Sequence, residues 1–102
     1  MKRMMVRYKV KPDRVAENER SIASVFEQLN REQPDGLRYA SFKLDDGVSF
    51  VHIVEVDTPD GSHPLQALSA FNAFTASVRD RCDEPPVSVD LHAVGAYHLF
   101  GG

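Results

Sequence analysis

The sequence predicts an α+β domain in which a four-stranded antiparallel sheet carries two helices on one face. Four stretches alternate apolar and polar residues as strands do, and two others repeat apolar residues at helical spacing. Their order is strand, helix, strand, strand, helix, strand. Right-handed crossovers place both helices on the same face, which is the ferredoxin-like βαββαβ arrangement. No repeat or linker interrupts the 102 residues, so we expect one domain over residues 1–102.

The first strand is predicted over Met4–Val10, where apolar and mainly basic residues alternate. Pro12 ends it, because proline cannot continue the hydrogen-bond ladder, and proline suits the first turn of a helix. The helix that follows has an apolar stripe that includes Val15, Ile22, Phe26 and Leu29. It ends before Pro-Asp-Gly, which is a strong helix stop.

The second and third strands form a hairpin over Leu37–Val56, because Asp-Gly between two apolar runs favours a tight turn. A two-residue loop would place Ser41 opposite His52 and Arg38 opposite Glu55. We favour this register, because the second pair joins opposite charges. A three-residue loop with a glycine bulge remains open, and it would place His52 opposite Ala40 instead.

Both faces of this hairpin carry aromatic and β-branched residues. A sheet with one solvated face shows regular polar alternation, and this one does not. The helices can cover only one face. We therefore expect a second copy of the chain to cover the other, so that the protein is a homodimer.

The second helix is predicted to begin at Pro64 and to end near Cys82, with an apolar surface nearly all round. The fourth strand is predicted over Val87–Val94. After a bulge at Gly95, a short extension is predicted over Ala96–Phe100.

Composition narrows the class of protein. The chain is 42% hydrophobic and 26% charged with a net charge of −3, which is ordinary for a globular protein. No apolar run is long enough for a membrane span or a signal peptide, so we expect a cytoplasmic location and no membrane contact. The acidic balance argues against a nucleic-acid partner. A single cysteine, Cys82, excludes an internal disulfide.

Several stretches together resemble the dimeric α+β barrel superfamily, and within it the antibiotic biosynthesis monooxygenase-like proteins. These stretches are the opening VRYKVKPDR, the PDG that ends the first helix, the strand LRYASF, and FVHIVEV before an Ala/Phe-rich helix. The resemblance covers about Met4–Phe100. It implies that two sheets pack face to face into a barrel with the helices outside. It also implies oxidation of aromatic, polyketide-like substrates without metal or flavin, or haem degradation as in a related branch.

The site residues typical of that family do not match this chain. Asp57 stands where its enzymes often have tryptophan, and Ile53 stands where they have asparagine. A common histidine of the second helix falls at Phe71 or Asn72. The asparagine of the haem-degrading branch would fall within residues 6–8, where there is none. These departures weaken both activities that the resemblance implies.

Candidate site residues remain without a motif. His52 beside a hydroxyl could act as a base, because histidine titrates near physiological pH, and Tyr39 could orient a phenol or quinone. Both could equally be hydrogen-bonded core residues. Further residues expected to line a substrate pocket are Tyr8, Phe71, Asn72 and Phe74, and exposure on the surface remains an open alternative for Asn72. The histidines show no metal-ligand spacing, so we expect no metal and no other cofactor.

Two functions follow from these observations. The first is a protein that binds an aromatic or quinone-like metabolite, or a cofactor-independent monooxygenase or isomerase that acts on one. The second is a non-catalytic homodimeric binding or assembly module, in which His52 and Tyr39 only pack the core. An open cavity with converging polar groups would favour the first, and a filled interface between helices and sheet would favour the second.

Overall fold

The computed structural model of the chain describes residues 1–99, so Phe100 at the end of the predicted extension lies outside the described residues. Its elements follow the predicted order. They are β1 (Lys2–Val10), a 3₁₀ turn (Pro12–Arg14), α1 (Val15–Glu32), β2 (Leu37–Lys43), β3 (Ser49–Val56), a 3₁₀ turn (Pro64–Ala67), α2 (Ser69–Ser77), a 3₁₀ turn (Val78–Arg81) and β4 (Cys82–Asp90).

The four strands form one antiparallel sheet in the order β2-β3-β1-β4. The two-residue register of the β2–β3 hairpin is confirmed, since Ser41 pairs with His52 and Arg38 pairs with Glu55. Gly47 in the turn has φ +76°, a conformation that glycine adopts without strain. The Glu55 carboxylate accepts a hydrogen bond from Arg3 Nε of β1 at 3.0 Å. The ion pair of Glu55 therefore joins β3 to β1, and not to Arg38 of β2.

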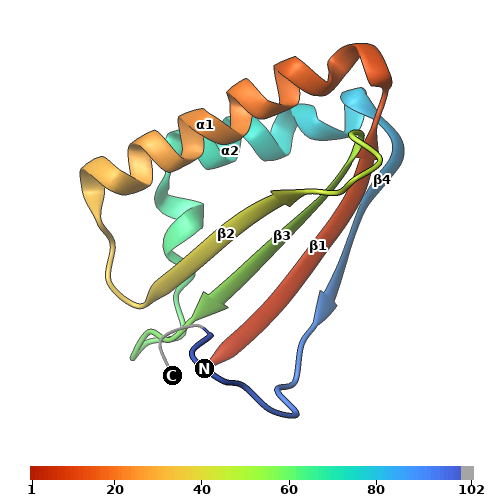
Figure 1. Cartoon of the computed structure of the whole chain (residues 1–102). Helices are drawn as coiled ribbons and strands as arrows, with labels where there is room; N and C mark the ends of the chain where they lie inside the picture. The colour runs from red at the N-terminus through yellow and green to blue at the C-terminus, as the bar shows by residue number, and fades with distance from the viewer. Residues whose placement is uncertain (100–102) are drawn as a thin grey trace.

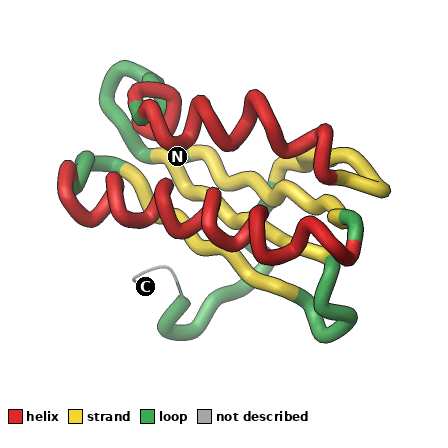
Figure 2. Tube along the Cα trace, turned by 90° about the horizontal axis from the view of Figure 1, so that it is seen from above, coloured by secondary structure: helices red, strands yellow, loops and turns green. Residues whose placement is uncertain are grey.

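Both helices lie over the same face of the sheet, as the predicted ferredoxin-like fold requires (Figure 1). Viewed from above, α1 and α2 run side by side across the strands (Figure 2). The Gln28 side chain of α1 accepts a hydrogen bond from the backbone N–H of Ala70 at 2.9 Å, which satisfies a donor in the first turn of α2. The core between helices and sheet consists of Tyr8, Val10, Val25, Phe50, Val54, Val56, Leu65, Leu68, Phe74 and Val78.

The sequence predicted that the second helical segment is one continuous helix, but the structure divides it. Leu68 has φ −91° and ψ 123°, which is an extended conformation, and it separates the Pro64–Ala67 turn from α2. Leu68 is also buried in the core. The apolar pattern continues through this break because the residues on both sides face the sheet, so periodicity alone predicted a longer helix.

The fourth strand begins earlier and ends earlier than the predicted Val87–Val94. β4 includes Pro85 and Pro86, which come before the start of the predicted strand. Proline is compatible with an edge strand, where one side of the strand needs no N–H donor. The pairing of β4 with β1 also shifts between Arg7 and Lys9, which is the irregularity that two prolines require.

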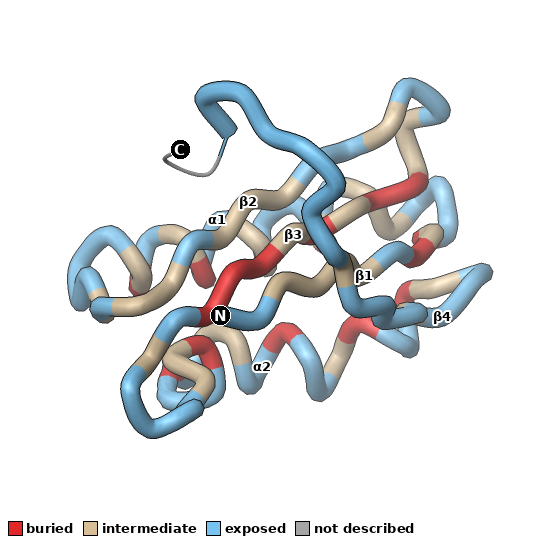
Figure 3. Tube along the Cα trace, turned by 90° about the horizontal axis from the view of Figure 1, so that it is seen from below, coloured by how far each residue is buried: buried red, intermediate tan, exposed pale blue. Residues whose placement is uncertain are grey.

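The sheet face opposite the helices is open in the single chain. Phe42 of β2 is 53% exposed there, and Val87 of β4 is 61% exposed. Figure 3, seen from the opposite side to Figure 2, shows exposed residues along β4 and buried ones concentrated in β3. Over residues 1–99, no helix has both the length and the apolar character needed to cross a membrane.

Candidate functional site

A cavity of about 160 Å³ lies between α2 and the helix-side face of the sheet. Its wall is almost entirely apolar, apart from a few polar atoms contributed by tyrosine, histidine and threonine side chains. Thr75 on this wall is exposed, so the cavity reaches the surface there. The lining residues are Met4, Val6, Tyr8, Tyr39, His52, Val54, His63, Leu65, Phe71, Phe74, Thr75, Val78 and Pro86.

His52 is the polar centre of this cavity wall. It lies in the middle of β3, points to the helix side, and is only 4% exposed. Its Nε2 lies 2.7 Å from the Tyr8 hydroxyl of β1. Its Nδ1 lies 2.7 Å from both the Tyr39 hydroxyl and the Ser41 hydroxyl of β2. Both ring nitrogens are therefore engaged with hydroxyl groups of the neighbouring strands.

The hydrogen bonds continue from Tyr8 away from the cavity. Asn18 Nδ2 of α1 donates to the Tyr8 hydroxyl oxygen at 3.0 Å. Arg81 Nη2 and Nε donate to Asn18 Oδ1 at 3.0 Å and 3.2 Å. Arg81 also donates to Ser77 Oγ at 2.8 Å, so α1, α2 and the three strands β1, β2 and β3 meet in one network.

Burial keeps this network uncharged around His52. It lowers the pKa of His52 to about 4, so the imidazole is neutral at pH 7. Burial also raises the pKa of Tyr39 to about 12 and that of Tyr8 further, so both phenols remain protonated. The only cation of the network, Arg81, lies two side chains away from the imidazole. The cavity therefore offers hydrogen bonds rather than charge.

The structure brings five of the six predicted site residues to this cavity. His52, Tyr39 and Tyr8 share hydrogen bonds, and Phe71 and Phe74 of α2 form apolar wall. The sixth, Asn72, does not reach it. Asn72 is exposed, and its side chain donates to the backbone carbonyl of Gln66 at 3.1 Å. Asn72 lies between two inward-facing residues of a helix, and helical geometry directs such a position outward.

The base role predicted for His52 stays a prediction, and the structure would route it through a neighbouring hydroxyl group. A base must offer a free lone pair to the ligand, and both nitrogens of His52 are occupied by hydroxyl groups. Of those hydroxyl groups, Tyr39 and Tyr8 border the cavity, and Tyr8 is also bonded to Asn18. Tyr39 is therefore the hydroxyl group placed to contact a ligand, and His52 shares the cavity wall with it.

Sequence analysis placed Ser41 beside His52 but missed Asn18 and Arg81. One signal could have found Asn18: it stands between Val15 and Ile22 on the apolar stripe of the first helix, where a polar side chain needs a buried partner. Arg81 gave no comparable signal, because its position after α2 is typical of a solvated helix end.

His63 adds a polar atom at another part of the wall. Its Nδ1 is buried and is the only such side-chain atom in residues 1–99 without a hydrogen-bond partner. His63 also borders a second hollow, beside Lys2 and Val56 at the end of the sheet. An unpaired buried nitrogen is costly, so its position on the cavity wall is consistent with a ligand that supplies the missing bond.

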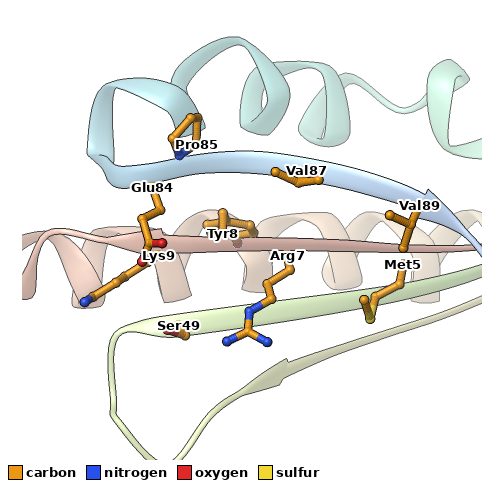
Figure 4. Close-up of a pocket in the computed structure, with 9 residues that line it drawn as sticks. All are labelled: Met5, Arg7, Tyr8, Lys9, Ser49, Glu84, Pro85, Val87 and Val89. Carbon is orange, nitrogen blue, oxygen red and sulfur yellow. The ribbon is translucent and has the colours of Figure 1, made fainter.

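A larger hollow of about 230 Å³ lies along β1 and β4 and contains mostly residues of the open face (Figure 4). Arg7 and Lys9 of β1 and Glu84 of β4 are among its polar residues. These side chains are not joined by a hydrogen-bond network like that around His52. We therefore place the candidate site in the smaller cavity on the helix side.

No group of three or more His, Cys, Asp or Glu residues within residues 1–99 is arranged to hold a metal ion. The single cysteine, Cys82, lies at the start of β4, and its thiol donates to the Val78 carbonyl at 3.1 Å.

No protein-family model and no curated protein matches this sequence. Solved structures do match it. A structure described as an antibiotic biosynthesis monooxygenase is 19% identical, with a TM-score of 0.75 over 93% of this chain and 100% of that one. Rv0793 from Mycobacterium tuberculosis is 16% identical, with a TM-score of 0.74 over 93% of this chain and 96% of that one.

A variant of SnoaB from Streptomyces nogalater, described as a cofactor-independent oxygenase, is 20% identical. Its TM-score is 0.67 over 93% of this chain and 94% of that one. At these identities the likeness shows the fold. The chain has the ferredoxin-like α+β fold of the antibiotic biosynthesis monooxygenase proteins, which confirms the predicted fold class and the resemblance on which it drew.

Proposed function

We propose that this chain binds a small aromatic or quinone-like metabolite in the cavity between α2 and the sheet. The observation that carries the proposal is His52, a neutral, buried imidazole held by three hydroxyl groups at the wall of an apolar cavity. Ligand sites have this character, with a mostly apolar wall and a few fixed polar groups. A purely structural histidine would not require an adjoining cavity.

The size of the cavity narrows the ligand class. An engineered cavity of about 150 Å³ binds benzene in another protein. The cavity of about 160 Å³ in this chain therefore suits a single six-membered ring with small substituents. A multi-ring, polyketide-like substrate, as the family resemblance implied, would have to extend out of the cavity past Thr75.

Tyr39 is the proposed contact to the ligand's oxygen atom. Because its pKa is raised to about 12, it remains a hydroxyl at neutral pH and can donate a hydrogen bond. Donors of this kind stabilise negative charge that develops on an oxygen when a carbonyl enolises or a phenol loses its proton. The same geometry would serve binding alone or a cofactor-independent oxidation or isomerisation. SnoaB, described as a cofactor-independent oxygenase on the same fold, supports the catalytic alternative.

Ligand binding tests this proposal directly. A panel of monocyclic phenols, quinols and ketones should raise the thermal unfolding temperature, because binding stabilises the folded state by mass action. Tyr39→Phe removes one hydrogen bond, so it should weaken binding of the oxygen-containing ligands by about two- to tenfold. Tyr97→Phe is the matched control, since Tyr97 is 87% exposed and outside the cavity.

Two results would contradict the proposal. One is that no monocyclic compound in the panel shifts the unfolding temperature. The other is that Tyr39→Phe and Tyr97→Phe bind every compound equally well. Turnover under air, followed by loss of the ligand's absorbance, then separates an enzyme from a binding protein. In an enzyme, His52→Gln should reduce kcat while the chain remains folded.

We also infer that two copies pack through their open sheet faces, which is the assembly that the alternative function requires. The support is the apolar surface on that face, where Phe42 is 53% exposed and Val87 is 61% exposed. Exposed apolar patches on a sheet mark interaction surfaces. Light scattering at micromolar concentration should give twice the chain mass, and Phe42→Glu should give the single-chain mass. A single-chain mass for the unaltered protein would overturn the inference.

A further inference from the structure

In the buried hydrogen bonds that lead from Arg81 to His52, the donor and the acceptor of each bond are fixed. A guanidinium group has only donors, and Arg81 directs two of them at Asn18 Oδ1, at 3.0 Å and 3.2 Å. The Asn18 amide is therefore oriented with its oxygen toward Arg81 and its NH₂ group toward Tyr8. Arg81 is 2% exposed and Asn18 is 0% exposed, so bulk solvent cannot replace either partner.

This orientation fixes the proton of Tyr8. The Tyr8 oxygen already accepts from Asn18 Nδ2, so its hydroxyl proton is free for the other neighbour, His52 Nε2 at 2.7 Å. Nε2 then accepts, and the neutral imidazole carries its proton on Nδ1. The opposite tautomer would leave the buried Tyr8 proton without an acceptor, a penalty worth about tenfold to a hundredfold in population.

The direction continues to the cavity wall. The Nδ1 proton is shared between Tyr39 and Ser41, each 2.7 Å away, and Ser41 also hydrogen-bonds the Tyr39 hydroxyl. These three groups hold three protons, and His52 accepts none of them because its Nε2 is occupied. One hydroxyl proton is therefore left over. Tyr39 borders the cavity, whereas Ser41 borders a separate surface hollow, and we assign the free proton to Tyr39, from which it points into the cavity.

We propose that Asn18 and Arg81 are positioning residues that hold His52 in its Nδ1–H tautomer, so that Tyr39 presents a donor to the cavity. The ligand atom that meets Tyr39 is then a hydrogen-bond acceptor, which is a carbonyl or an anionic oxygen on a single ring. This inference rests on the proposed function of the cavity as a ligand site. It adds the chemical class of the contacting atom and the two residues that select it.

The tautomer can be read directly by ¹⁵N NMR of the histidine side chains at pH 7, because protonated and bare imidazole nitrogens have well-separated shifts. We expect His52 of the unaltered protein to carry its proton on Nδ1. A proton on Nε2 would overturn the inference. This measurement needs no ligand, so it stands even if the proposed function fails.

Asn18→Asp should reverse the direction with almost no change in shape. A carboxylate has only acceptors, so one oxygen would keep the Arg81 contact and the other would take the Tyr8 proton. His52 would then donate from Nε2 to Tyr8, and its bare Nδ1 would accept from Tyr39 or Ser41. Asn30→Asp is the matched control, because it makes the same change on the same helix at an exposed position. The tautomer should change only in the first variant.

A pair of ligands of the same shape tests the consequence for binding. Cyclohexanone has a carbonyl oxygen where methylenecyclohexane has a CH₂ group. The ratio of their dissociation constants should favour the ketone by about two- to tenfold more in the unaltered protein than in Asn18→Asp. An unchanged ratio, with the tautomer reversed, would overturn the assignment of an acceptor to the ligand. If neither compound binds the unaltered protein, the proposed function fails and only the tautomer result remains.

Discussion

The two faces of the sheet are built from the same strands but give their buried polar side chains different kinds of partner. On the helix side, His52 lies among hydroxyl groups, and burial lowers its pKa to about 4, so it is neutral at pH 7. On the open side, Glu55, which lies further along β3, forms an ion pair with Arg3. Glu55 is itself only 7% exposed, so the paired guanidinium of Arg3 compensates for the water that its carboxylate has lost. The comparison teaches that the partners of a buried polar group decide its charge, because His52 meets only hydroxyl groups whereas Glu55 meets a guanidinium.

The largest expected effect comes from the apolar core of the helix side. Phe50 is 2% exposed and its ring stacks on Tyr8, with 5.6 Å between ring centroids. Phe50→Ala should lower the free energy of unfolding by about 3–5 kcal/mol, because it removes a buried ring and leaves a cavity. Urea unfolding at pH 7 measures this loss. A loss below about 1 kcal/mol would show that the helix side is packed no more tightly than the open side.

The second expected effect is a pH dependence that belongs to the helix side. His52 has a pKa of about 4 in the folded chain, against 6.5 in the unfolded chain. Between these values the unfolded chain binds the proton more readily, so the free energy of unfolding falls as the pH drops from about 6.5 toward 4. Above about pH 6.5 the contribution of His52 to stability is fully present. The full difference is about 3 kcal/mol. Urea unfolding between pH 7 and pH 4.5 measures it.

His52→Gln is the variant that isolates this effect, because glutamine has no titratable group in the range. His63 has a pKa that burial also lowers, so a smaller slope should remain in the variant. If the unaltered protein and His52→Gln lose stability in parallel as the pH falls, His52 is not the buried neutral group described above.

The fold was predictable because its signals are local. The Asp-Gly turn set the β2–β3 register, so the predicted pairing of Ser41 with His52 is confirmed and His52 was correctly joined to a hydroxyl. The edge strand β4 was harder, since its two prolines are ordinary loop signals. They are tolerated because only one side of β4 needs a partner, which is a property of the sheet order.

The candidate site was only partly predictable, because its network joins residues far apart in the chain. Asn18 and Arg81 are 63 positions apart, and they meet only when α1 and the 3₁₀ turn after α2 pack on the same strands. Nothing in the local sequence around Arg81 marks it as buried. Tyr39 and Tyr8 could be named because alternation along the strands placed them on an apolar face. Asn72 was named for its sequence neighbours, and helical geometry turned it to solvent.

The smallest expected effect on the single chain comes from the open face. Phe42→Ala is the counterpart of Phe50→Ala on a neighbouring strand, but Phe42 is already 53% exposed and has little burial to lose. At low protein concentration the free energy of unfolding should fall by less than about 1 kcal/mol. A dimer that buries Phe42 would make stability rise with protein concentration, and the substitution should reduce that rise. Urea unfolding at two concentrations tests both statements. If Phe42→Ala costs as much as Phe50→Ala when the chains are dilute, the open face is stabilised within the single chain, and the contrast between the two faces fails.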